Sequence, residues 1–143
     1  MKKFEFIGHT ADIRMKVAGA TQEELFASAF EGLSELLSKS FCKDSSAERK
    51  DAEAVEVGIA IDSPDMTALL VDFLSEVLLN SHEQKAVFCT VDFSSITETA
   101  LTATLKGSSI DGFDDDVKAV TYHEADIVKN ADGEYETIIV FDI

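Results

Sequence analysis

The residues best suited to chemistry lie near the end of the chain, where His123, Asp142 and the α-carboxylate of Ile143 follow or flank a turn signal. That signal is Asp132-Gly133 between two strand-like runs, and Asp-Gly favours a two-residue hairpin turn because both central residues must accept positive φ. Such a turn predicts that His123 faces Asp142 and that Tyr122 faces Ile143, with opposed side chains about 5 Å apart. One spot would then hold an imidazole and two carboxylates, whereas a slip of one residue in the register would send His123 to the other side.

The acid at the end of the last strand-like run needs a partner. Ile138 to Phe141 form a continuous apolar run, as expected of a buried strand, and Asp142 follows it directly. A cation, a helix N-terminus or water could satisfy this carboxylate. Two interpretations of Asp142 therefore stay open: its carboxylate is solvated at a frayed chain end, or it is one ligand of a metal site.

A second group of polar residues lies near the start of the chain, in Gly8-His9-Thr10-Ala11-Asp12. Turn chemistry explains it simply, with Asp12 closing an Asx-turn. The functional interpretation is a metal or proton-transfer site made together with the C-terminal acids. Clustered carboxylates suit hard cations such as Ca²⁺, Mg²⁺ or Mn²⁺. A histidine ligand, from His9 or His123, would shift the preference to Mn²⁺ or Zn²⁺.

Other candidate residues carry weaker signals. Lys118 follows three aspartates and, taken alone, is a surface lysine that screens an acidic run. His82 follows a helix C-terminal region, where a capping role is expected. The sequence contains no phosphate-binding P-loop, no dinucleotide fingerprint and no G-x-S-x-G motif. These absences disfavour nucleotide hydrolysis by a P-loop mechanism and serine-based acyl transfer.

The composition predicts one acidic domain over residues 1–143, because 45% apolar residues suffice for a single core. Twelve basic and 28 acidic residues give a net charge of −16, which repels nucleic acid and anionic membranes and favours cations and basic partners. Acidity alone equally serves solubility. Cys42 and Cys89 belong to no C-x-x-C pair and are interpreted as reduced intracellular thiols. Without a signal peptide or a membrane-spanning run, we expect a cytoplasmic protein.

Two amphipathic helices must position these residues. In the first, Thr21 and Glu24 form a capping box ahead of an apolar series that extends to Leu37. The second is predicted to begin at Ser63 as N-cap, with Pro64 at the first helical position. Its apolar residues follow steps of three and four, namely Met66, Leu69, Leu70, Phe73, Leu74, Val77 and Leu78.

The rest of the chain alternates at period two, as half-buried strands do. The alternating runs are 4–6, 13–17, 55–61, 87–93, 101–105 and the two arms of the C-terminal hairpin, 117–128 and 134–143. Residues 38–53 and 107–116 are polar and predict loops. Strands on either side of two helices predict an α+β fold, with two helices packed on a mostly antiparallel multi-stranded sheet in two layers.

The order of several short motifs resembles the archease family. In chain order they are His9-Thr10-Ala11-Asp12, Thr21-Gln22-Glu23-Glu24-Leu25-Phe26, the helix segment Leu69 to Leu78, Lys118-Ala119-Val120-Thr121-Tyr122-His123 and the closing Phe141-Asp142-Ile143. Each motif alone is weak. Together they cover nearly the whole chain in order, and this makes the resemblance specific.

The resemblance implies an accessory protein rather than an enzyme. Archeases are similar to cofactors of the RNA-splicing ligase that joins tRNA halves: they promote its guanylylation by GTP and its multiple turnover, and a bound divalent metal is part of that role. The family's metal-binding aspartates fall on Asp12 and Asp142, and Ile143 lends its terminal carboxylate. Its functional lysine falls on Lys118, which would contact the ligase or a phosphate. His9 and His123 match motif positions and are looser candidates for the metal.

Two other functions stay open. A metal-dependent hydrolase acting on phosphoesters would need a base and an electrophile clamp, which His123 and Lys118 could supply. A chaperone-like or purely structural binding module predicts no metal and an activity insensitive to Asp12. One departure from the family is the short stretch between Leu105 and Lys118, where Asp114 to Asp116 stand. We expect it to change contacts with a partner more than the metal site.

Overall fold

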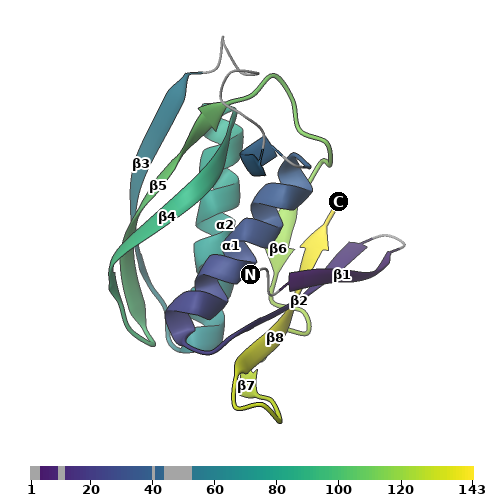
Figure 1. The fold of residues 1–143 in the computed structure, drawn as a ribbon, viewed down its shortest axis with the longest axis vertical. Helices are drawn as coiled ribbons and strands as arrows, with labels where there is room; N and C mark the ends of the chain where they lie inside the picture. Colours follow the sequence, from purple (N-terminus) through teal and green to yellow (C-terminus); the bar gives the residue numbers. More distant parts are fainter. Residues whose placement is uncertain (1–3, 10–11, 40, 44–52) are drawn as a thin grey trace.

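The structure, a computed structural model, describes residues 4–9, 12–39, 41–43 and 53–143, of which Gly8, His9 and Lys43 are described by their backbone alone. Two helices lie between two sheets (Figure 1). The helices are α1 (Gln22–Leu37) and α2 (Met66–Gln84), with a short 3-10 helix η1 (Phe41–Lys43). The five-stranded sheet consists of β1 (Phe4–His9), β2 (Asp12–Gly19), β6 (Ala119–Thr121), β7 (Val128–Lys129) and β8 (Tyr135–Asp142). Its strand order is β1-β2-β8-β6, and β7 also pairs with β8. The three-stranded sheet has the order β3-β5-β4, made of β3 (Ala54–Asp62), β4 (Ala86–Ile96) and β5 (Ala100–Ser109).

The predicted α+β class is confirmed, and every pairing between described strands is antiparallel. The strands are divided between two sheets, one on each side of the helices (Figure 1). The sequence pattern did not resolve this division, because strands of either sheet show the same period-two alternation. As a consequence, each sheet turns one face to the helices and its other face outward.

The core lies where the helices meet both sheets. Phe73 of α2 is its centre: the ring centroid of Phe73 lies 5.8 Å from that of Phe26 and 6.3 Å from that of Phe30, both on α1. On the other side, the Phe73 ring contacts Phe93 of β4 at 5.5 Å. Aromatic pairs at this spacing add to the free energy gained from burial alone. These rings therefore join the two helices to each other and to the three-stranded sheet.

Helix α1 begins where the sequence predicts. The hydroxyl of Thr21, the N-cap, accepts a hydrogen bond from the Glu24 amide at 3.1 Å. The Glu24 carboxylate reaches back to the amide of Ala20 at 3.0 Å, one residue before the position that a capping box usually serves. The first bond satisfies an amide of the first turn that the helix itself leaves unpaired, and the second holds the residue before the N-cap against the helix.

Helix α2 begins two residues later than predicted, so the assignment of Ser63 as N-cap is wrong. The N-cap is Asp65, whose carboxylate accepts a bond from the Ala68 amide at 2.8 Å. Asp65 has an extended backbone, with φ −155° and ψ 175°, which leaves Pro64 before the helix. The predicted apolar stripe is buried apart from Met66, which is half-buried. Within the described residues, neither helix is long and apolar enough to cross a membrane.

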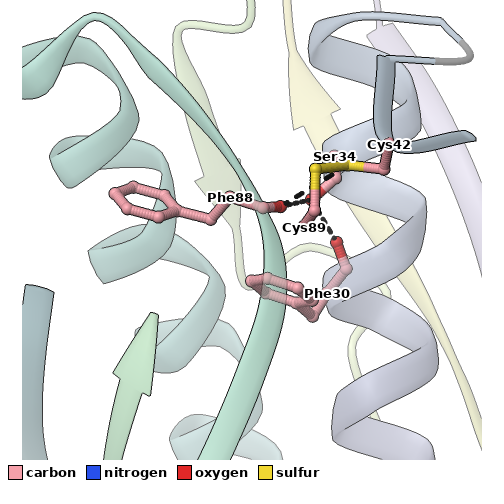
Figure 2. The surroundings of a disulfide bond; sticks show 5 residues. All are labelled: Phe30, Ser34, Cys42, Phe88 and Cys89. Atoms are coloured by element: carbon pink, nitrogen blue, oxygen red, sulfur yellow. Dashed lines mark hydrogen bonds between the residues drawn. A yellow bond between two sulfur atoms is a disulfide. The ribbon is translucent and has the colours of Figure 1, made fainter. Parts of the chain in front are cut away.

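Cys42 and Cys89 form a disulfide, so the expectation of two reduced thiols is wrong. Helix η1 follows α1 closely and packs against β4, which brings the two Cα atoms to 5.4 Å although the residues are 47 apart in sequence. Figure 2 shows the bond beside Ser34 of α1, whose hydroxyl donates to the carbonyl oxygen of Phe88 at 2.6 Å. No sequence motif marks this pair, because its proximity arises only from the packing of η1 on the sheet.

Candidate metal and partner site

The turn of the C-terminal hairpin is longer than predicted. Lys129 pairs with Tyr135, so five residues rather than two connect the strands. The Asn130 side-chain oxygen accepts bonds from the amides of Asp132 at 2.9 Å and Glu134 at 3.0 Å. Gly133 has a positive φ of 78°, which a residue without Cβ accepts at no steric cost. Asn130 therefore organises a wider turn, and Asp132-Gly133 is only part of it.

The register that placed His123 opposite Asp142 and Tyr122 opposite Ile143 is wrong. Seven residue steps separate Thr121 from Val128, but only four separate their partners Val140 and Glu136. The segment 122–127 therefore leaves the ladder, and β6 pairs with β8 in a different register, in which Ala119 faces Asp142. His123 lies in this segment with an exposed side chain, and its amide donates to the Thr121 hydroxyl at 3.3 Å.

The structure instead brings together the two aspartates near the chain ends. Asp12, the first residue of β2, is the direct Cα partner of Asp142, the last residue of β8. Directly opposed residues of an antiparallel pair share a sheet face, with Cβ atoms about 5 Å apart. Asp12 is half-buried and Asp142 is exposed. Two carboxylates thus lie side by side where the inner strands β2 and β8 end, and we call this end of the five-stranded sheet the acidic edge.

Two further candidate residues lie at the acidic edge. Ile143 follows Asp142 and is 38% exposed. The amide of Lys118 donates to the carbonyl oxygen of Asp142 at 2.7 Å, and the Lys118 side chain is exposed. The backbone of the lysine motif is therefore tied to the residue that carries the candidate carboxylate. Both Asp142 and Lys118 are accessible to a molecule that approaches from solvent.

The paired carboxylates fit a divalent cation as a partial ligand set. Hard cations prefer oxygen ligands, and two adjacent carboxylates supply charge as well as donors. Among the side chains that the structure describes, no three His, Cys, Asp or Glu residues gather into a larger group. The side chain of His9, and Thr10 and Ala11 entirely, lie outside the described residues.

Sequence reasoning missed an ion pair that holds the 122–127 segment on the sheet. Arg14 of β2 donates to both carboxylate oxygens of Glu124, from Nε at 2.9 Å and from the terminal nitrogen at 2.7 Å. These hydrogen bonds lower the pKa of the Glu124 carboxyl. Glu124 in turn raises the pKa of Arg14, with a smaller contribution from the charge of Asp12. Arg14 therefore joins the acidic edge to the segment that carries His123.

The other side of the same segment is fixed to helix α2. The Tyr122 hydroxyl donates to the Asp72 carboxylate, which also accepts a bond from the Ser63 hydroxyl at 2.6 Å. The hydrogen bond to Asp72 raises the pKa of the Tyr122 phenol. The Ile127 amide donates to the Thr67 hydroxyl at 3.0 Å. Only the helical position of Asp72, nearly two turns into α2 and outside the apolar stripe, could have marked it as a candidate.

His82 connects helix α2 to the loop that precedes Lys118. Its Nε2 lies 3.0 Å from the carbonyl oxygen of Val117, so that nitrogen carries the proton and donates. The His82 ring also meets the ring of Phe113 edge to face at 5.2 Å. The predicted capping role is wrong, since the helix continues to Gln84 and its C-cap is Lys85.

Comparison with known proteins agrees with this architecture. The chain matches the model of the Archease protein family (MTH1598/TM1083) over residues 4–143. Protein archease of Methanosarcina barkeri is 33% identical, with 99% of this chain and 97% of the relative covered. Protein archease of Pyrococcus abyssi is 32% identical, with 100% of both chains covered.

Solved structures show the same fold. The solution structure of Methanobacterium thermoautotrophicum protein 1598 has a TM-score of 0.71 and 28% identity, and 100% of both chains is covered. The crystal structure of an archease, described as a possible chaperone, from Thermotoga maritima has a TM-score of 0.65 at 20% identity, with 96% of this chain and 94% of that chain covered. At that identity the second likeness shows the fold alone.

The fold and the acidic edge define a small acidic α+β protein in which two sheets enclose two helices and Asp12 lies opposite Asp142 in the strand pairing of β2 with β8. With matches over nearly its full length, the chain belongs to the archease family.

Proposed function

We propose that this protein activates an RNA-splicing ligase of the kind that joins tRNA halves, by promoting guanylylation of the ligase and its multiple turnover. In this role the protein is an accessory factor of the cytoplasm and not an enzyme in its own right. Membership of the archease family supports the proposal. The observation that carries it is the direct pairing of Asp12 with Asp142, because it joins two distant motif positions at one accessible edge.

In the proposed site, Asp12, Asp142 and the terminal carboxylate of Ile143 hold a divalent metal ion, which is Ca²⁺, Mg²⁺ or Mn²⁺. Such an ion supplies positive charge beside the phosphates of a nucleotide bound to the ligase. His9 stays a candidate ligand at the same end of β1 and β2. His123 keeps its motif position, but the observed register removes the geometric argument for it.

Lys118 is proposed to contact the ligase or a phosphate. Its side chain is exposed, and the hydrogen bond from its backbone amide to the carbonyl oxygen of Asp142 supports a position near the proposed metal. The net charge of −16 steers the protein toward a basic surface of the ligase and disfavours strong direct binding to RNA or to anionic membranes.

The test is a guanylylation assay of a cognate ligase at limiting metal, with and without this protein. Asp142→Ala is expected to abolish the stimulation, because it removes one of the two paired carboxylates. Asp132→Ala is the matched control, since it removes an exposed acid from the turn of the same hairpin. Stimulation by Asp142→Ala equal to that by the wild type would show the metal assignment to be wrong. Turnover of a phosphoester by this protein without any ligase would favour the hydrolase instead.

A further inference from the structure

The outer face of the five-stranded sheet is the largest feature that the proposed site leaves unused. Both helices pack on the inner face, so no helix among the residues that the structure describes covers the outer one (Figure 1). The register places Lys16 of β2 between Glu5 of β1 and Ile138 of β8 on this outer face. Ile7 and Glu136 share the same face by alternation. Aliphatic and charged side chains therefore stand together on a surface that neither described helix covers.

This face is hollowed. A groove of about 340 Å³ lies over it, between the strands and the segment 122–127 that arches above them. Its apolar lining is Ile7, Ile138 and Val128, and Val128 is 49% exposed. A second hollow of about 280 Å³ continues it on the other side of Lys16 and shares Glu136 with it. We call the two together the sheet groove.

The charges that line the sheet groove are mostly negative. Glu124 is neutralised by Arg14. Asp126 and Glu136 line the first hollow, Glu5 lines the second, and Lys16 stands between them. An aliphatic floor with acidic sides matches a segment that carries lysine or arginine among aliphatic residues, because the aliphatic stems of basic side chains pack on apolar surface while their heads meet carboxylates.

We propose that the sheet groove is a second contact surface of this protein, and that it seats a basic, extended segment of the ligase. The inference rests on the proposed function and adds to it the surface and the chemistry of the partner. Asp12 and Lys16 are four residues apart on β2, so Lys16 in the groove lies about 13 Å along the strand from the acidic edge. One partner can therefore occupy both, with its nucleotide site at the acidic edge and a basic segment along the sheet.

The outer face of the three-stranded sheet provides the contrast. Its strands present small residues there, such as Gly58 and Ala60, and its lysine, Lys106, is paired with Asp92 at 3.3 Å. Glu56 and Asp62 on that face are exposed acids comparable to those of the groove. Substitutions on that face thus change the net charge equally without touching the sheet groove.

The decisive experiment compares two charge-reversed variants. Asp126→Lys/Glu136→Lys reverses two acids of the groove, and Glu56→Lys/Asp62→Lys is the control with the same change in net charge. Binding of each to the cognate ligase is measured by calorimetry, together with stimulation of guanylylation. We expect at least about tenfold weaker binding for the groove variant only. Equal affinities for the two variants, with stimulation by the wild type intact, would overturn this inference and leave the proposed function standing.

A second measurement does not depend on the folding of a variant. Methyl NMR spectra of the wild-type protein are recorded as ligase is added, and Ile7, Val128 and Ile138 are expected to shift, whereas Ala60 is not. Shifts at Ala60 alone, or groove shifts produced by tRNA halves without ligase, would overturn the assignment to a basic protein segment. If the wild type neither binds nor stimulates the ligase, the proposed function fails and the inference fails with it.

Discussion

The disulfide between Cys42 and Cys89 allows a stability prediction whose size follows from the structure. The bond closes a loop of 47 residues between η1 and β4. A cross-link of this span removes conformational entropy from the unfolded chain, and the chain-entropy relation gives about 4 kcal/mol at 25 °C for a loop of this length. For a chain of this size, that corresponds to a fall in Tm of roughly 8–16 °C when the bond is opened.

The assay is thermal and urea unfolding, followed by circular dichroism, of the oxidised protein, the protein in excess reductant, and Cys42→Ser/Cys89→Ser. The reduced protein and the double variant should unfold at the same lower temperature, and reductant should not affect the double variant. The hydrogen bond from the Ser34 hydroxyl to the Phe88 carbonyl oxygen does not involve either cysteine side chain and should persist in all three samples. The secondary structure before unfolding should therefore be the same. Equal midpoints for the oxidised and reduced wild type would refute the reasoning, because the cross-link would then contribute nothing.

Three further predictions follow from contacts outside the disulfide. Glu124→Gln should speed amide hydrogen exchange in the segment 122–127, because it weakens the bond to Arg14 that holds this segment on the sheet. The pKa of Glu124 is lowered on folding, so in the wild type the protection from exchange should be lost as the pH falls through that lowered pKa. In a tyrosinate absorbance titration, Tyr122 should ionise above its ordinary range, because the hydrogen bond to Asp72 favours the neutral phenol and raises its pKa. The stability that this hydrogen bond contributes is then lost as the pH rises toward the raised pKa. Asp72→Asn should lower the midpoint of the titration, and an unchanged midpoint would contradict the hydrogen bond. Gly107→Ala should destabilise the protein by about 3 kcal/mol or more in urea unfolding, because the new Cβ would lie 2.0 Å from the Val87 carbonyl oxygen. In the control Gly58→Ala, the new Cβ meets nothing within 4 Å, and this variant should be more stable by about 0.5–1 kcal/mol.

Local chemistry explains what the sequence could predict. Thr21 and Glu24 are three residues apart, and their bonds form within one helical turn, so the start of α1 could be predicted from residue types alone. The apolar stripe of α2 and the period-two runs fixed the α+β class in the same way. The N-cap of α2 was missed because Ser63 and Asp65 are both good caps, and only the extended backbone at Asp65 decides between them.

Contacts between distant residues explain what could not be predicted. Arg14 and Glu124 are 110 residues apart, and no spacing rule connects them. The hairpin register failed for a related reason: Glu124 adopts a positive φ of 67°, which residue type does not announce, and the segment around it leaves the ladder. The family motifs implied that Asp12 and Asp142 lie close together, and the structure pairs them directly. This closeness comes from the pairing of β2 with β8, whereas the predicted hairpin concerned only the contact of Asp142 with His123.

A calorimetric titration of the metal-free protein with Mn²⁺ tests the central claim most directly. The account predicts one site per chain in the wild type, loss of that site in Asp12→Ala and in Asp142→Ala, and its retention in Asp132→Ala. Saturating the wild type at about 100 times the dissociation constant should also raise its free energy of unfolding by about 2.7 kcal/mol. Mn²⁺ binding that is unchanged by both substitutions at the acidic edge would contradict the account.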